Sequence, residues 1–380
     1  MTSPPEREAP LRVTTLELFF DLVFVFTITQ LTGVIYRRPT LESAGQVLLV
    51  FGVLWWMYGG YAWLTNTRSP RRLPERLLLL LAMAGFLVIG MSIPNAFDGD
   101  GVALGLGYLL VVVVHAGLYL RVNRNFQRIL PFNLLAPLLV IAAGLCRGHP
   151  AAVYALWAAA LALQALTPLI VKLGDQFSIE PAHFTERHGA LIIVAFGESV
   201  ADVGFGAVDG HRLTAGLALS AILGLALTAA LWWVFFGTGD DDRAEEAMRA
   251  ASPDARPQLA LNAFFYAYIP MLLGVLAVAS GLKHAVGSPG APLSSGLAAA
   301  LACGTALFLA GDALFRWTLN IGTQRYRLTA SALCAAIGWP VAVTAPAVVT
   351  LIVLTLIIAL ALTADTKGSD ESSTPIEGQR

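Results

Sequence analysis

The chain has little charge for its length. Charged residues make up 13 % of its 380 residues and hydrophobic residues 57 %, against about 25 % and roughly 45–50 % in soluble domains. This shortage of charge excludes a water-soluble globular fold, because too few charged side chains are present to cover its surface. The 24 basic and 25 acidic residues nearly balance, so the basic excess typical of nucleic-acid binding is missing as well.

Several motifs that carry chemistry are also absent. The three cysteines, Cys146, Cys303 and Cys334, lie far apart, which argues against a disulfide framework and against a metal site. No Gly-rich phosphate loop, Ser/His/Asp arrangement or CxxC pair occurs, so we expect no cofactor, and an enzymatic activity is less expected than a non-enzymatic one. The polar N-terminal segment also lacks the pattern of a cleavable signal peptide.

What the sequence does contain is a series of apolar stretches, each of about 18–25 residues. They predict an all-α, polytopic transmembrane bundle. The twelve predicted spans are 16–36, 43–64, 76–94, 101–120, 129–146, 151–171, 188–207, 213–237, 259–282, 294–317, 328–345 and 347–364. The last two are separate spans because one helix of their combined length would be about 55 Å long, against roughly 30 Å of hydrocarbon.

The positive charges predict the orientation of these spans. An even number of spans places both tails and the even-numbered loops on one side of the membrane. That side receives 19 of the Lys and Arg residues and the other side receives 5. Because basic loops stay inside the cell, we expect a multi-pass protein of the inner (cytoplasmic) membrane with both termini cytoplasmic.

Twelve spans suggest two halves of six, related as a parallel internal repeat. Trp55-Trp56 in the second span is matched by Trp232-Trp233 in the eighth, and Arg121 and Arg316 end the fourth and tenth spans. The predicted organisation is a cytoplasmic tail (1–15), a first half (16–171), a cytoplasmic linker (172–187), a second half (188–364) and a disordered cytoplasmic tail (365–380).

Acidic residues inside the predicted spans are the candidate functional residues. The first span carries Glu17 and Asp21, and the seventh carries Glu198 and Asp202. Each pair is spaced i, i+4 and therefore lies on one face of its helix. A buried charge costs roughly 2.5–3.5 kcal/mol on insertion scales, so such residues usually serve a function. We expect the four to bind a substrate or ion, and we expect Asp21 and Glu198 to meet in one polar cavity.

The alternative interpretation is that these acids only stabilise the structure. Glu17 would then cap the first turn of its helix, where the helix dipole favours a negative charge, and Asp21 would pair with a neighbour such as Arg121. A structural role is least expected for Glu198, which lies near the middle of the membrane. For Asp202 a structural and a functional role are equally expected.

Other polar residues would support these acids. The run His183–His188 is interpreted as an interfacial salt-bridge cluster rather than as a metal site, and Asp312 and Arg316 as an i, i+4 ion pair. The supporting residues are Glu186, Arg187, His188, Arg121, His115, Asp312 and Arg316.

Two motifs resemble those of a known family. The segments LELFFDLVFVFTITQLT and ERHGALIIVAFGES are similar to the two signatures of the bacterial low-temperature requirement A family. The second segment departs slightly, at Ala190-Leu191 and at Phe196, and neither departure affects an acidic residue. The resemblance implies an integral membrane protein. Its signature positions here would be Glu17, Phe20, Asp21, Glu186, Arg187, Gly197, Glu198 and Ser199.

The sequence favours a secondary transporter or ion pathway that uses carboxylates within the membrane. Carboxylates between two halves are how proton- or cation-coupled carriers bind their ion. The alternative is an intramembrane enzyme that acts on a lipid or isoprenoid with a buried carboxylate as general acid or base. A third possibility is a structural or regulatory membrane protein. The expected partners are the lipid bilayer and a small ion or proton, and the sequence leaves the oligomeric state open.

Overall fold

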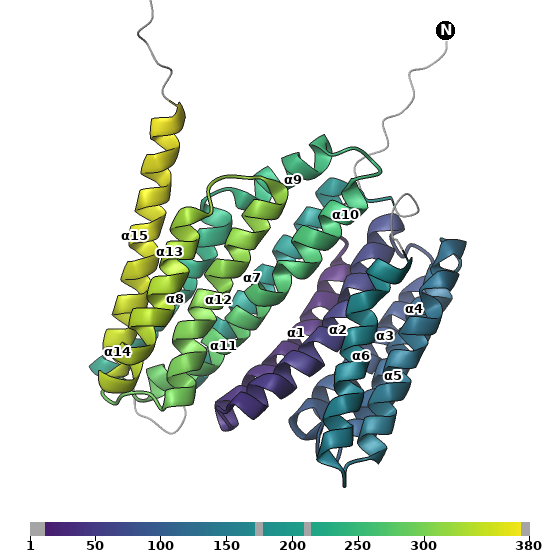
Figure 1. Ribbon diagram of the computed structural model, residues 1–380, viewed down its shortest axis with the longest axis horizontal. Helices are drawn as coiled ribbons and strands as arrows, with labels where there is room; N and C mark the ends of the chain where they lie inside the picture. The colour runs from purple at the N-terminus through teal and green to yellow at the C-terminus, as the bar shows by residue number, and fades with distance from the viewer. Residues whose placement is uncertain (1–11, 172–177, 209–213, 374–380) are drawn as a thin grey trace, which may run out of the picture.

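The fold is a bundle of membrane-spanning helices. A computed structural model describes residues 12–171, 178–208 and 214–373. Within these ranges twelve helices are long and apolar enough to cross a membrane, and no strand occurs in this part of the chain. The predicted all-α polytopic architecture is therefore confirmed (Figure 1).

The first six spans form one half of the bundle. Its helices are α1 (Thr15–Arg37), α2 (Leu41–Thr67), α3 (Leu73–Ser92), α4 (Gly101–Tyr119), α5 (Leu130–Leu145) and α6 (Pro150–Val171). Short 3₁₀ turns, η1 (Ile93–Asn95) and η2 (Arg124–Arg128), follow α3 and α4.

The second half contains three π-helical turns that the first half lacks among its described residues. Its elements are α7 (Pro181–Val208), α8 (Ala215–Trp232), η3 (Trp233–Gly237), α9 (Asp240–Ala250), α10 (Arg256–Ala260), η4 (Leu261–Tyr266), α11 (Tyr268–Gly287), α12 (Ser295–Leu319), α13 (Arg325–Leu333), η5 (Cys334–Gly338), α14 (Trp339–Thr344) and α15 (Ala347–Ser373). The π turns are η3, η4 and η5. A π turn breaks the regular backbone ladder and frees carbonyl groups for other donors.

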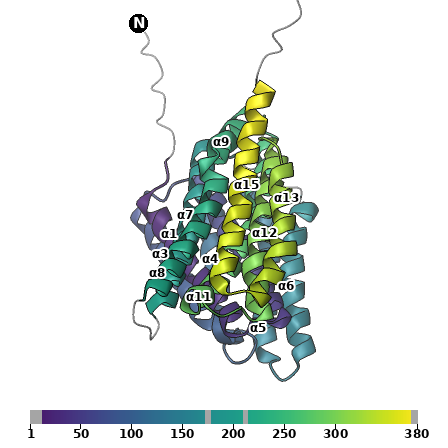
Figure 2. The same cartoon turned by 90° about the vertical axis from the view of Figure 1, so that its left-hand side faces the viewer.

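The described chain begins and ends at the same end of the bundle, which we call the tail end (top in Figure 1), and the opposite end is the far end. Figure 2 shows the same arrangement from the side of α15. Two helices extend beyond the predicted boundaries. Helix α7 begins at Pro181, since proline suits the first turn of a helix, so 181–187 are helical. Helix α15 continues to Ser373, so 365–373 are not an irregular tail.

Helices pack in the same order within the two halves. In the first half, α1 contacts α2 and α3, α3 contacts α4, α4 contacts α5, and α5 contacts α6. In the second half, α7 contacts α8 and α11, α11 contacts α12, α12 contacts α13, and α13 contacts α15. Close approach depends on glycine in both halves. A Cβ atom on Gly85 would lie 3.1 Å from the Gly107 carbonyl oxygen, and one on Gly274 would lie 2.8 Å from that of Gly304. Small residues permit such contacts between membrane helices.

The two halves also differ at positions where the sequence suggested equivalence. Trp55 is fully buried, whereas Trp232 and Trp233 are 38 % and 55 % exposed. The indole Nε1 of Trp55 donates to the Phe265 carbonyl at 3.0 Å, and Phe265 lies in the π turn η4. This bond joins the two halves. In an uninterrupted α-helix the Phe265 carbonyl would instead accept a backbone N–H of its own helix.

Candidate functional site

Helix α1 begins with a capping box that positions its first carboxylate. The Thr14 backbone N–H and hydroxyl both donate to Glu17 Oε2 at 2.7 Å, and the Thr14 hydroxyl accepts from the Glu17 backbone N–H at 3.3 Å. The predicted capping role of Glu17 is therefore confirmed. Asp21 lies one turn further along the same face, so both carboxylates point into the bundle at the tail end and are fully buried.

Helix α7 supplies the partners of these carboxylates. Arg187 Nη2 lies 3.0 Å from Asp21 Oδ1, and Nη1 lies 3.7 Å from Glu17 Oε1. His183 Nε2 faces Glu17 Oε1 at 3.2 Å. Arg187 also donates to the hydroxyl of Thr65 near the end of α2. We call Glu17, Asp21, His183 and Arg187 the α1–α7 cluster. The salt-bridge interpretation of the 183–188 run is confirmed for Arg187.

The tautomer of His183 follows from the backbone near it. The Asn66 side chain accepts from the Glu180 backbone N–H at 2.9 Å, which identifies its oxygen, and its Nδ2 donates to the Glu180 carbonyl at 2.9 Å. The same Nδ2 lies 3.2 Å from His183 Nδ1. Since an amide nitrogen donates, this contact fits the His183 tautomer in which Nδ1 accepts and Nε2 faces Glu17.

The α1–α7 cluster consequently contains one carboxylate more than it has fixed cations. Glu17 receives the Thr14 donors and faces Arg187 and His183, so it is held as the anion. Asp21 has the Arg187 contact on Oδ1, and its carboxylate also interacts with the Tyr58 hydroxyl. A proton on Asp21 would balance the charge of the cluster.

A second group of acids lies toward the far end of α7. Asp202 Oδ1 is 3.5 Å from Lys283 Nζ near the end of α11, and Lys283 lies 5.0 Å from the centre of the Tyr36 ring. Glu198 is half-buried and interacts with the Thr29 hydroxyl on α1, with Asp202 and with Lys283. We call Glu198, Asp202 and Lys283 the far-end group. It also has one carboxylate more than it has cations.

Helices α1 and α7 pack together as expected, but Asp21 and Glu198 belong to different polar groups. Asp21 contacts Arg187, and Glu198 lies eleven residues further along α7, about 16 Å at 1.5 Å per residue. The expected shared cavity is therefore corrected to two groups along one helix pair. Between them, α1 and α7 carry buried apolar side chains that include Phe24, Ile28, Leu191 and Ala195. This apolar layer separates the two groups.

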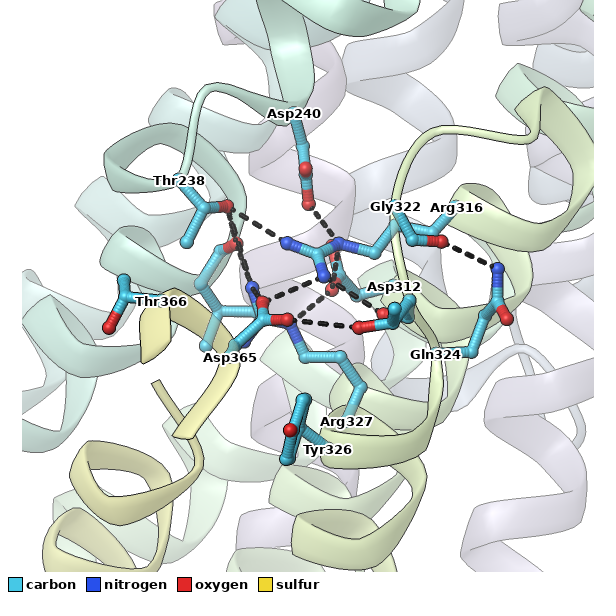
Figure 3. A network of polar contacts seen from close by, with 12 residues as sticks. Thr238, Asp240, Asp312, Arg316, Gly322, Gln324, Tyr326, Arg327, Asp365 and Thr366 are labelled. Carbon is cyan, nitrogen blue, oxygen red and sulfur yellow. Dashed lines mark hydrogen bonds and ion pairs between the residues drawn. The ribbon is translucent and has the colours of Figure 1, made fainter. Parts of the chain in front are cut away.

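A third concentration of charge lies in the second half, at the tail end (Figure 3). Arg316, in the last turn of α12, contacts Asp240 at 2.6 Å and Asp365 at 2.8 Å. Arg327 on α13 contacts Asp312 at 2.9 Å and Asp365 at 3.5 Å. The predicted pair Asp312–Arg316 is the longest of these contacts, at 3.9 Å, because Arg327 takes the carboxylate of Asp312.

Arg243 completes this arrangement by contacting Asp240 at 2.5 Å. The π turn η3 contributes an acceptor, since the Val234 carbonyl receives Arg327 Nη2 at 3.1 Å. We call the assembly the four-helix network, after α9, α12, α13 and α15, and its members are Asp240, Arg243, Asp312, Arg316, Arg327 and Asp365. Three carboxylates meet three guanidinium groups, so the network is neutral as it stands.

The remaining predicted residues lie outside these groups. His188 is buried and its Nδ1 bonds the Phe184 carbonyl at 2.8 Å. His115 is buried among aromatic rings, consistent with a packing role. Glu186 and Arg121 are exposed, and the pairing of Asp21 with Arg121 considered above is replaced by the pairing with Arg187.

Sequence reasoning missed several members of these groups. Asn66 and Tyr58 are ordinary polar residues in an aromatic span, and nothing in their spacing marks them. Lys283 was counted only as a loop charge. Arg327 and Asp365 were assigned to a span edge and to a tail, although an isolated charge at the end of an apolar helix could have indicated a partner.

Comparisons with known proteins agree with the resemblance. The family model described as bacterial low temperature requirement A protein matches residues 12–363. An uncharacterized protein of Rhizobium meliloti (strain 1021) is 27 % identical over 311 residues, which cover 78 % of this chain and 75 % of that protein. No solved structure matches the chain.

Proposed function

Because the chain belongs to the bacterial low temperature requirement A family, and because its α1–α7 helix pair carries surplus carboxylates, we propose that it is a secondary transporter that moves protons along this pair. The proposal rests on the numbers of carboxylates and fixed cations in two polar groups. Both the α1–α7 cluster and the far-end group have one more carboxylate than fixed cations. In a membrane, such a surplus favours uptake of a proton or a cation.

A proton suits the α1–α7 cluster better than a metal ion. The oxygens that could ligate a cation beside Asp21 are Glu17 Oε1, Asp21 Oδ2 and the Tyr58 hydroxyl, and a bare cation such as Ca²⁺ takes about six to eight. Among the described residues, no group of three or more His, Cys, Asp or Glu side chains could hold a metal ion. One proton, by contrast, requires only the free carboxylate oxygen.

The apolar layer between the two groups favours a carrier over an open channel. Buried apolar side chains such as Phe24 and Leu191 lie along α1 and α7 between Asp21 and Glu198. Transfer therefore requires α1 and α7 to move relative to one another, as in alternating access. The matching packing order of the two halves supports the proposed parallel repeat, in which α1 and α7 are the equivalent first helices.

The enclosed position of the carboxylates supports transport over a lipid-modifying enzyme. An enzyme acting on a lipid or isoprenoid needs its acid or base to open sideways toward the bilayer. Glu17 and Asp21 are fully buried behind the packed faces of α1, α2 and α7, so neither meets that requirement.

Proton flux in proteoliposomes tests the proposal. Vesicles that contain the protein and an internal pH-sensitive dye would be given a pH gradient, with Na⁺ or K⁺ as the counter-ion. We expect flux above that of protein-free vesicles and a loss of at least about tenfold in Glu198→Gln. The matched control is Glu42→Gln, since Glu42 is an exposed far-end carboxylate bound by the Tyr154 hydroxyl at 2.7 Å. Absence of flux under both counter-ions, or normal flux in Glu198→Gln, would contradict the proposal.

A further inference from the structure

A groove lies between the start of α1 and the first turns of α3, at the tail end. Its volume is about 780 Å³. One wall is the segment from Arg12 to Phe19, and the other runs from Ser69 to Leu80. The groove is separate from the α1–α7 cluster, although Thr14 lines it and also donates to Glu17.

The upper part of this groove carries uncompensated positive charge. Arg12, Arg71 and Arg76 line it, and no carboxylate does. None of these three arginines forms an ion pair within the described part of the chain. The acid nearest in sequence, Glu75, binds Arg68 at 3.1 Å and belongs to a neighbouring cavity on the α4 side of the loop. Arg76 Nε donates to the Pro70 carbonyl at 3.3 Å, but three guanidinium groups without a carboxylate partner in one groove attract a phosphate.

The lower part of the groove is apolar and open to the surroundings of the bundle. Phe19 is 49 % exposed, Leu77 55 % and Leu80 40 %, and all three line the groove. They lie on helices long and apolar enough to span the membrane, so their exposed faces meet lipid chains. A soluble anion would contact only the arginines, whereas a phospholipid would place its phosphate there and its acyl chain along the apolar floor.

We propose that this groove binds one anionic phospholipid, with the headgroup phosphate held by Arg12, Arg71 and Arg76 and an acyl chain packed on Phe19, Leu77 and Leu80. Basic residues at the ends of membrane helices attract acidic headgroups. The amphipathic lining distinguishes this groove from a diffuse basic surface. The inference does not depend on proton transport.

Native mass spectrometry of the detergent-purified full chain tests this site with phosphatidylglycerol and phosphatidylcholine as probes. The variant R12Q/R71Q/R76Q removes the three charges of the groove. The control R68Q/R72Q/R121Q removes three charges from the neighbouring cavity, which those arginines line. We expect phosphatidylglycerol affinity to fall on the order of tenfold to a hundredfold in the groove variant and less than about twofold in the control.

A second variant tests the same groove if R12Q/R71Q/R76Q fails to fold. Leu80→Trp fills the apolar floor without changing charge and should also weaken phosphatidylglycerol binding. Three results would overturn the proposal: equal retention of phosphatidylcholine, an equal loss of affinity in the control variant, or complete displacement of the lipid by inorganic phosphate. The last result would show that the groove recognises a free anion only.

Discussion

Two clusters of buried charge lie at the tail end of the bundle, the α1–α7 cluster and the four-helix network. Both consist largely of buried side chains, and both join helices that are distant in the sequence. The network contains three carboxylates and three arginines. The α1–α7 cluster contains two carboxylates, one arginine and a histidine whose Nδ1 faces the Asn66 amide. The balanced network can fasten helices, whereas the unbalanced cluster needs a proton to become neutral.

The comparison shows that burial of charge does not by itself identify a functional site. A fully paired network is a structural feature, because removing one partner leaves an uncompensated charge in a medium of low dielectric constant. A surplus carboxylate has a different consequence, since its charge changes whenever a proton arrives or leaves. Counting the charges of each group separates these two roles, and variants can test the separation.

Removing Arg316 should have the largest effect on stability. Arg316→Gln leaves Asp240 and Asp365 without their shared cation, so we expect a loss of about 3–5 kcal/mol in the free energy of unfolding. Denaturant titration of the detergent-solubilised protein measures this loss. Arg325→Gln is the control, because Arg325 is exposed and stacks on Tyr326. A difference below about 1 kcal/mol between the two variants would show that the network does not hold the helices.

The same change from aspartate to asparagine should act differently in the two clusters. Asp240→Asn removes one charge from the balanced network and should cost about 3 kcal/mol. Asp21→Asn replaces a carboxyl group that we expect to be protonated, so it should change stability by less than about 1 kcal/mol, while proton flux falls at least about tenfold. Unfolding and flux measured on the same preparations test both statements. Equal destabilisation by the two variants would mean that Asp21 is a structural anion.

Replacing His183 should have the smallest effect. Glutamine can present its amide N–H near the position of Nε2, so His183→Gln keeps a donor toward Glu17 and removes only the acceptor for Asn66. We expect a change of about 1 kcal/mol or less in stability and little change in flux. A loss as large as that of Arg316→Gln would show that His183 carries a positive charge and that the cluster is balanced.

The fold could be predicted largely from the sequence because membrane spans are long and uniform in composition. All twelve spans, including the division between 328–345 and 347–364, correspond to helices. The error at Asp365 arose because a polar C-terminal sequence resembles a disordered tail. Only the packing of α15 against α13 brings its carboxylate to Arg316 and Arg327.

The candidate site was predicted in part. The i, i+4 spacing identified Glu17 and Asp21 as one face, and the run at the start of α7 identified Arg187 as an ion-pairing residue. The partners could not be matched because sequence spacing does not give the depth at which two distant helices meet. The contact of His183 with Asn66 depends on the Glu180 backbone, which orients that amide, and such a chain of contacts has no sequence signal.

Infrared spectroscopy of the purified protein tests most directly whether the α1–α7 cluster holds a proton. A protonated carboxylic acid has a carbonyl stretch that a carboxylate lacks, and this band can be followed at neutral pH. The account predicts such a band in the wild type, a loss of one acid's intensity in Asp21→Asn, and no change in the exposed control Glu42→Gln. A wild-type spectrum without the band, or an Asp21→Asn spectrum identical to the wild type, would contradict it.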